Sequence, residues 1–384
     1  MTSRTRTRFR LVSSFPLLLT AAITVLLGAG ILRYPAACAE GIRNGLTFCG
    51  QTLIPSLFPF MVLSAFVVKS GLSAKISRFL EPVTRFLFHL PGCTAATILI
   101  GLIGGYPAGA RGIKALIERG DITVQQGERM LCFAVGAGPA FVISVVGGGL
   151  LGNGKAGLIL FVSQTLGAVL IGVVSGLFSR HSAEPTSNRR QAPQETPPLS
   201  SALVESAADS TNGLINMCSF VILFSAILML VQACGLSDWL SGALIAIGIP
   251  QSAAQSMLSI FLEVSGGCTQ AALNGASPML ISFALGWAGA CVHFQISASL
   301  KSIRFSKAKF TLFRFLHGLL AALISFAGFR LFPDVAETFS TVSSPAAQAS
   351  SSSASGSIML VIVCIAFLLT FGARSGFRHK KVVK

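Results

Sequence analysis

Long apolar stretches separated by short polar segments run through almost all of the 384-residue chain. A membrane-spanning helix needs about 20 apolar residues, and the pattern predicts about eight of them. The expected full spans lie near 14–32, 45–68, 127–151, 156–179, 214–234, 276–299, 309–331 and 358–373. The first follows basic residues, as a signal peptide does, but its length and the lack of a convincing cleavage site favour a retained anchor.

Two further segments are too rich in glycine and polar residues at their centres to be ordinary spans. They cover 92–118, centred on GGYPAGA (104–110), and 250–274, centred on EVSGGCTQ (263–270). Non-helical backbone is tolerated at membrane depth only where protein or a wet cavity satisfies its polar groups. We therefore expect two re-entrant helical hairpins whose tips meet in the membrane; the alternative is a kinked full span at each place.

A broken apolar span occurs twice. Residues 133–142 read FAVGAGPAFV, and residues 283–292, 150 positions later, read FALGWAGACV. Paired segments interrupted by glycine or proline in corresponding halves of a chain are typical of a transporter's binding site. GLSAK (71–75) and GLSDW (235–239) precede the two hairpins in the same order. The pattern predicts an internal repeat.

Amphipathic stretches lie just before each hairpin. Residues 76–90 place apolar side chains at helical spacing, and 238–249 form a weaker counterpart. A helix of this kind lies along the membrane interface.

Composition agrees with a membrane protein, since 52% of the residues are hydrophobic, 11% are charged and the mean hydropathy is +0.74. The formal net charge of +16 comes from basic residues in short clusters between apolar runs, without the interleaved aromatic residues of a nucleic-acid surface. The nine cysteines are scattered and show no CxxC spacing, so they indicate neither a zinc site nor a disulfide framework.

Charge placement predicts the topology. Suppose that the hairpins do not cross the membrane and that both termini are cytoplasmic. Then 25 of the 29 basic residues lie on the cytoplasmic side, and Arg314 is one of these 25. The two halves then run in opposite directions, which makes the predicted fold an inverted repeat. The expected organisation is 1–40 (tail and first span), 41–180 (first repeat), 181–200 (cytoplasmic linker), 201–332 (second repeat), 333–357 (extracytoplasmic loop) and 358–384 (last span and basic tail).

Four segments carry a family resemblance: PSLFPFMVLS (55–64), GGYPAGARG (104–112), ERMLCFAVGAGPAFVISVVG (128–147) and LEVSGG (262–267). They resemble the YlbJ-type sporulation integral membrane proteins, which share the nucleoside-recognition or Gate domain. The resemblance covers roughly residues 40–330. It implies a fold related to concentrative nucleoside transporters and a role in moving dipicolinic acid during spore formation, in a membrane that surrounds the forespore.

The candidate site follows from the tips and breaks. Glycines at a tip leave backbone groups available to a ligand, and a new half-helix amino terminus suits a carboxylate. Glu263 in an apolar hairpin suggests a proton or cation site, or an acceptor for a substrate; the alternative is a structural hydrogen bond to backbone. The candidate solute- or ion-binding residues are Gly104, Gly105, Tyr106, Pro107, Gly136, Gly138, Pro139, Glu263, Ser265, Gly266, Gly267, Thr269, Gln270, His293 and Gln295.

Several alternatives stay open at this stage. Tyr106 is expected to stack on a ring or to donate its hydroxyl, and His293 to serve a substrate, a proton or only a backbone carbonyl. Arg111 and Lys114 either attract a dianion or anchor the topology.

No nucleophile–base set, HExxH motif or P-loop stands out, so the chain is not expected to be an enzyme, and no cofactor or metal is expected beyond a coupling ion, H⁺ or Na⁺. We expect a transporter of a small anionic or aromatic solute working by alternating access, in contact with lipid and not with nucleic acid. The alternatives are a nucleoside or nucleobase permease and a non-transporting scaffold of the spore envelope, and a homo-oligomer is left open.

Overall fold

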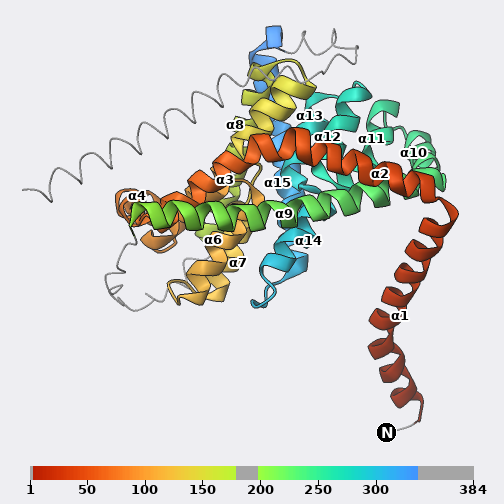
Figure 1. Cartoon of the computed structure of the whole chain (residues 1–384), viewed down its shortest axis with the longest axis horizontal. Helices are drawn as coiled ribbons and strands as arrows, with labels where there is room; N and C mark the ends of the chain where they lie inside the picture. The colour runs from red at the N-terminus through yellow and green to blue at the C-terminus, as the bar shows by residue number, and fades with distance from the viewer. Residues whose placement is uncertain (1–2, 179–197, 336–384) are drawn as a thin grey trace, which may run out of the picture. The chain divides into compact units, whose positions relative to one another are not determined.

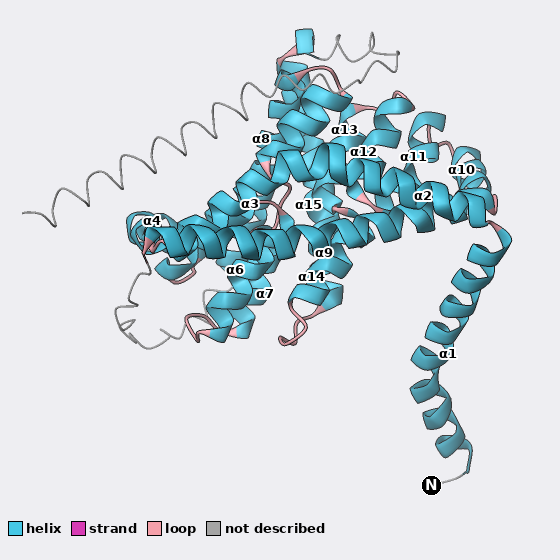
Figure 2. Ribbon diagram, in the orientation of Figure 1, coloured by secondary structure: helices cyan, strands magenta, loops and turns pink. Residues whose placement is uncertain are grey.

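The computed structural model describes residues 3–178 and 198–335, with side chains from residue 18 onward. Every regular element in these two ranges is a helix, as Figure 2 shows. They belong to one compact unit, Met1–Ser343. The predicted final span at 358–373, nearly all of the predicted linker (181–200) and nearly all of the predicted loop (333–357) lie outside the described residues.

Five helical stretches are long and apolar enough to cross a membrane. They correspond to the spans predicted near 45–68, 156–179, 214–234, 276–299 and 309–331. The first combines α2 (Pro35–Phe48), η1 (Cys49–Leu53) and α3 (Ile54–Lys69), and the fourth combines α13 (Pro278–Trp287) and α14 (Gly289–Ser299); the others are α8 (Gly154–Phe178), α9 (Leu199–Ala233) and α15 (Lys307–Leu331). The expected anchor at 14–32 lies in α1 (Ser3–Arg33), and the part of this helix with described side chains, Leu18–Arg33, is apolar.

The span predicted at 127–151 is not one continuous helix. α7 (Val124–Phe133) ends before a non-helical segment, 134–139, and the π-helix η3 (Ala140–Leu150) follows. Proline has no backbone N–H and glycine disfavours helix, so Gly136, Gly138 and Pro139 account for the interruption. The break expected within this span is confirmed, and it divides the span into α7 and η3.

The second break is sharper. α13 ends at Trp287 and α14 begins at Gly289, with Ala288 between them at φ 73° and Gly289 at φ 71°. An alanine in the left-handed region costs about 1–2 kcal/mol. Because Ala288 is fully buried, the surrounding packing holds this strained turn in place.

Two pairs of short helices lie in the chain where the re-entrant hairpins were expected. The first helix pair is α5 (Ala95–Ile103) with α6 (Tyr106–Glu118), and the second is α11 (Gln251–Leu262) with α12 (Val264–Leu273); the two helices of each pair pack against each other. At about 1.5 Å per residue, helices of 9–13 residues reach only about 14–20 Å. None of the four alone crosses a hydrocarbon core of about 30 Å.

The amphipathic stretches form α4 (Leu72–Phe88) and α10 (Leu236–Ala246). α4 turns by 105° into the segment Gly92–Ile103, and this bent pair is a sixth candidate span or a re-entrant element. The side chains of Phe79 and Phe86 are 82% and 80% exposed. An apolar face left open to this extent suits a helix lying on the membrane surface.

Close glycine contacts bring long helices together. α2 and α9 lie side by side (Figure 1), where a Cβ on Gly45 would stand 2.8 Å from the Cα of Ile222. α13 packs on α15 where a Cβ on Gly286 would stand 2.5 Å from the Cα of Gly318. Small residues of this kind let helix backbones approach closely in membranes.

The ends of several helices share one side of the molecule. The Ser302 hydroxyl donates to the Glu118 carboxylate at 3.1 Å, and the Ser306 N–H donates to Glu128 at 2.8 Å. The α6–α7 turn and the α14–α15 turn therefore lie together, in agreement with the placement of α7 and α14 in Figure 1. The long helices α8 and α15 also pack against each other.

Candidate functional site

A cavity of about 50 Å³ lies where the turns of the two helix pairs meet the first break. Its wall is formed by the turn of the first helix pair, the first break, the turn of the second helix pair, and parts of η1, α3, α9 and α14. The lining residues are Leu53, Leu57, Met61, Gly104, Gly105, Tyr106, Pro107, Ala137, Gly138, Phe141, Met217, Val221, Glu263, Val264, Ser265, Val292 and Gln295.

The structure brings part of the predicted site together at this cavity. The predicted residues that line it are Gly104, Gly105, Tyr106, Pro107, Gly138, Glu263, Ser265 and Gln295. The predicted residues outside its wall are Gly136, Pro139, Gly266, Gly267, Thr269, Gln270 and His293. Residues from both helix pairs, although far apart in sequence, thus share one small space.

Glu263 joins the two helices of the second pair. Its side chain is only 4% exposed, and its carboxylate accepts hydrogen bonds from the N–H groups of Ser265 at 2.9 Å and Gly266 at 2.6 Å. A carboxylate at this position satisfies two orphan donors and lies at the positive end of the helix dipole. The structural hydrogen bond considered for Glu263 is therefore made, while the same residue lines the cavity.

Other predicted residues of the second pair serve its internal structure. A Cβ on Gly267 would stand 2.6 Å from the Cα of Ile260, so this glycine permits close packing of α12 on α11. The Thr269 hydroxyl donates to the carbonyl of Ser265 at 2.9 Å. The Gln270 amide donates to Asn274 at 3.2 Å. These groups use their hydrogen-bonding capacity within or beside their own helix.

His293 lies away from the cavity wall. Its Nδ1 lies 2.7 Å from the carbonyl oxygen of Gly289, and its ring packs against Trp287 and Phe310 at centroid distances of 4.6 and 5.1 Å. Of the three roles considered for His293, the hydrogen bond to a backbone carbonyl is the one present in the structure. Gln295, one turn away from Cys291, donates to that thiol at 3.3 Å and faces the cavity.

Tyr106 connects the first helix pair to the second broken helix. Its hydroxyl donates to the carbonyl of Leu285 at 2.6 Å. That bond occupies the phenolic proton, so the hydroxyl is not free to donate to a solute. The residue lines the cavity with its remaining surface, and the guanidinium carbon of Arg314 lies 5.8 Å from its ring centroid.

Arg314 of α15 was missed by the sequence analysis, which assigned it to the cytoplasmic surface. The side chain is fully buried (0% exposed) and donates to the carbonyls of Val135, at the first break, and Gly286, near the end of α13. Among the described residues, no acidic group lies within 4 Å of it. The carboxyl ends of α7 and α13 each carry about half a negative charge, so together they balance one guanidinium.

Two more polar residues support the first break and were also missed. The Gln164 side chain, on α8, donates to the carbonyl of Ala137 at 2.8 Å, and His317 Nε2 lies 2.7 Å from the Gln164 carbonyl. All of these groups are buried. The available signal was a polar residue in the middle of an apolar span, which is costly and so usually has a specific role.

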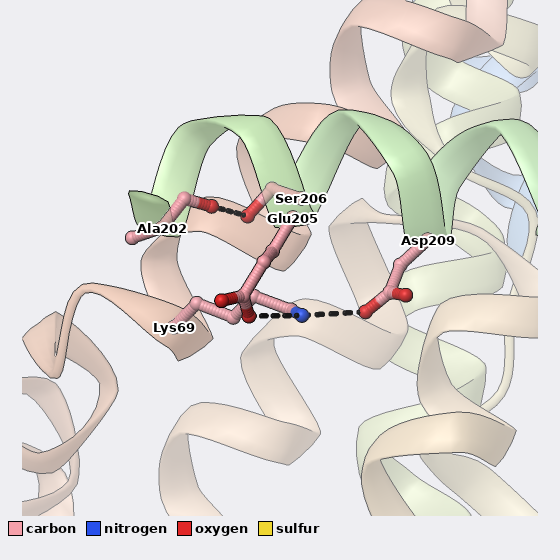
Figure 3. Close-up of polar contacts among 5 residues, drawn as sticks. All are labelled: Lys69, Ala202, Glu205, Ser206 and Asp209. Atoms are coloured by element: carbon pink, nitrogen blue, oxygen red, sulfur yellow. Dashed lines mark hydrogen bonds and ion pairs between the residues drawn. The ribbon is translucent and has the colours of Figure 1, made fainter. Parts of the chain in front are cut away.

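An ion-paired cluster lies beyond the cavity and is shown in Figure 3. The ammonium group of Lys69, at the end of α3, contacts Glu205 at 3.0 Å and Asp209 at 2.7 Å, both on α9. We name these three residues the Lys69 cluster. Lys114, by contrast, pairs with Glu118 on its own helix at 3.7 Å, which favours its interpretation as a topology anchor.

The residues that the structure describes contain no group of three His, Cys, Asp or Glu side chains arranged to hold a metal ion. The polar groups at the cavity are instead backbone amides and carbonyls, one carboxylate, one side-chain amide and two hydroxyls. Such a set can bind a small polar solute or a monovalent cation.

Comparison with known proteins gives one informative relative. The chain is 26% identical over 336 residues to the sporulation integral membrane protein YlbJ of Bacillus subtilis (strain 168). The alignment covers 81% of this chain and 82% of the relative. The chain is therefore a homologue of that protein and an integral, multi-pass membrane protein. No family model matches the chain, and no solved structure matches it.

Proposed function

We propose that this homologue of an integral membrane sporulation protein is a transporter that moves a small anionic or aromatic solute by alternating access. The observation that carries the proposal is the shared cavity, which both helix pairs and the first broken helix line. Discontinuous helices facing each other near the middle of the membrane are how many secondary transporters bind their substrates. A role in sporulation is drawn from the relative's name, and the placement in a membrane around the forespore is what the family resemblance implies.

An inverted repeat accounts for the order of the elements. The sequence of a long helix, a surface helix, a short helix pair, a broken helix and a second long helix occurs as α3 to α8 and again as α9 to α15. α7 starts on the side of Ser306, α14 ends on that same side, and Arg314 contacts both breaks. The two broken helices therefore approach the centre from opposite sides. The short pairs are then re-entrant hairpins entering from opposite faces.

The size of the cavity supports a closed state. At about 50 Å³ it has room for only a few water molecules or one ion, whereas pockets that hold organic ligands measure about 300–1,000 Å³. A solute of the size of dipicolinic acid or a nucleoside requires the hairpin tips to separate. A transporter that closes around a central site between its two open states has such a conformation.

The chemistry of the wall favours a solute with an anionic group. The amino termini of α6 and η3 lie at the cavity, and neither has a side-chain cap. Uncapped N–H groups at a helix start bind carboxylates. The corresponding end of α12 is already capped by Glu263, so Glu263 marks the second half as the place for a proton or Na⁺ to couple.

Dipicolinic acid is the solute that the family resemblance implies, and a nucleoside or nucleobase is the second candidate. A non-transporting scaffold is the alternative of a different class. The apolar wall and its aromatic ring suit either solute, and the uncapped helix starts favour dipicolinic acid because it carries carboxylates.

Uptake by cells that express the chain tests the proposal. Glu263→Gln removes the charge, and Gly105→Leu places a side chain at a residue with φ 85° at the tip. Both variants should insert in the membrane and lose solute accumulation. Matched controls are Asp238→Asn and Gly242→Leu in α10, where Asp238 is exposed and a Cβ on Gly242 meets nothing within 4 Å.

Full uptake by both site variants would refute the binding site. A scaffold should instead keep its role in both variants and respond to changes in the predicted linker at 181–200 or in the tails.

A further inference from the structure

Three layers of residues lead away from the cavity along α9. Met217 lines the cavity, Gly213 lies one turn nearer the start of the helix, and Asp209 lies one turn beyond that. Four residues of helix advance by about 6 Å. The Lys69 cluster therefore sits about 12 Å along the helix from the cavity wall, and Gly213 lies between the two.

Arg111 occupies this middle layer. It lies on α6, four residues after Pro107, which lines the cavity. A Cβ on Gly213 would stand 3.0 Å from the guanidinium carbon of Arg111 and 3.1 Å from the terminal methyl of Met61, another lining residue. Only a glycine leaves room for the guanidinium against α9. Arg111 therefore packs against α9 at Gly213, one helical turn after Pro107 of the cavity wall.

The guanidinium of Arg111 has no carboxylate partner within 4 Å in the part of the chain that the structure describes. It is partly buried, where an unpaired charge is costly. Ser210, three residues before Gly213 on α9, has a buried hydroxyl with no hydrogen-bond partner among the described residues. A positive charge and a spare hydroxyl on facing helices suit an anion.

Asp209 is the acidic residue of α9 that lies one helical turn before Gly213. Asp209 does not pair with Arg111; Lys69 instead holds Asp209 at 2.7 Å and Glu205 at 3.0 Å, as Figure 3 shows. The Lys69 side chain is 25% exposed, against 58% and 61% for the two carboxylates, so the lysine is the more fixed partner.

We propose that Arg111 binds the anionic group of the solute beside the cavity, and that Lys69 keeps Arg111 available by holding Glu205 and Asp209. The proposal rests on the proposed transport function and adds to it the residue that selects for negative charge. Arg111 contacts the solute directly, whereas Lys69 is a positioning residue. Without Lys69, Asp209 turns to Arg111 and competes with the solute for the same guanidinium, because a bidentate carboxylate pair is favourable.

The test measures equilibrium binding of two probes to the purified full chain, dipicolinate as the dianion and uridine as the neutral solute. Arg111→Gln should weaken dipicolinate binding by roughly tenfold to a hundredfold, the usual effect of losing a hydrogen bond to a charged group. Lys69→Gln should weaken it in the same direction although Lys69 does not touch the solute. Uridine binding should change little in either variant.

A third variant separates competition from damage to the fold. Lys69→Gln with Glu205→Gln and Asp209→Asn also removes the cluster, but it leaves no carboxylate to compete for Arg111, so dipicolinate affinity should return to near the wild-type value. Lys114→Gln on the same helix as Arg111 is the matched control and should bind like wild type.

The proposal is overturned if wild-type protein binds dipicolinate and Lys69→Gln binds it equally well, or if the triple variant stays as weak as Lys69→Gln. Arg111→Gln that loses dipicolinate and uridine to the same extent also overturns it. Failure of the proposed function is a different result: wild-type protein then neither binds nor transports either probe.

Discussion

Glu263 and Arg314 show how single charges are held in an apolar core by the ends of broken helices. The carboxylate of Glu263 caps the positive end of α12, and the guanidinium of Arg314 joins the negative ends of α7 and α13. Each helix end supplies about half a charge of the needed sign. The breaks therefore create the local charges that stabilise these side chains, and the side chains fix the breaks.

Replacing Arg314 by lysine should destabilise the protein although it keeps the charge. A lysine ammonium lacks the planar fork that reaches two carbonyls at once, and each unpaired carbonyl costs about 1–3 kcal/mol. The melting temperature of detergent-purified Arg314→Lys should fall well below that of wild type. Arg304→Lys, at an exposed site, is the matched control, and equal melting of the two variants would contradict this role.

Two substitutions at Tyr106 separate its hydroxyl from its ring. Tyr106→Phe removes the hydrogen bond to Leu285 and should lower thermal stability by about 1–3 kcal/mol, because a buried carbonyl loses its partner. Binding of an aromatic solute should persist. Tyr106→Leu also removes the ring and should weaken that binding by about 0.5–1.5 kcal/mol, the worth of an aromatic pair. Binding by Tyr106→Leu at wild-type strength would exclude stacking on this ring.

The sequence identifies a buried charged residue only when its apolar neighbours are adjacent in the chain. Glu263 is recognisable because Leu262 and Val264 flank it directly. Arg314 was misassigned because it lies close to the basic segment Lys301–Lys309, and its partners, Val135 and Gly286, are far away in the chain. From sequence alone, an arginine near the end of a span is compatible with a surface anchor and with a buried donor to backbone carbonyls, and only the tertiary contacts distinguish the two.

At the scale of elements, the breaks were predictable and their consequences less so. Gly136, Gly138 and Pro139 mark the first break in the sequence, and the structure ends α7 at Phe133. The conversion of residues 140–150 into a π-helix was not predicted. Nor was the left-handed Ala288, because tertiary packing imposes a conformation that alanine itself disfavours.

Close approach of α13 and α15 gives a test at this scale. Gly286→Ala places a Cβ 2.5 Å from the backbone of Gly318 and should push the helices apart, at a cost of about 1–3 kcal/mol. Gly242→Ala in α10 meets open space and should be neutral or stabilising by up to about 1 kcal/mol, since alanine favours helix. Thermal melting of the two purified variants checks the difference, and equal stability would argue against tight packing here.

At the scale of the molecule, the order of the elements could be predicted from hydropathy and charge, whereas the contacts between the halves could not. Five of the predicted spans and both short helix pairs appear where the pattern indicated them. The meeting of the two tips at the cavity was expected from the sequence, but the distant side chains that hold the tips together were not. The hydrogen bonds from Arg314, Tyr106 and Gln164 join segments that are far apart in the chain, so they too could not be predicted from the sequence.

Sidedness of the second repeat, which the inverted arrangement fixes, can be measured with introduced cysteines. The native Cys268 is fully buried, so it cannot report on access, and the native cysteines are best replaced by alanine. Ser302→Cys and Ser277→Cys are both at exposed positions between helices. A membrane-impermeant maleimide should label Ser302→Cys from the cytoplasmic side and Ser277→Cys from the other side. Labelling of both from one side would rule out the inverted arrangement.

Transport by the purified protein alone is the central claim. The direct measurement is accumulation of labelled dipicolinate, with uridine in parallel, by liposomes containing the full chain under an imposed H⁺ or Na⁺ gradient. The account predicts saturable accumulation above protein-free liposomes that Glu263→Gln abolishes. Folded, membrane-inserted protein that moves neither solute under either gradient would contradict it and favour the scaffold.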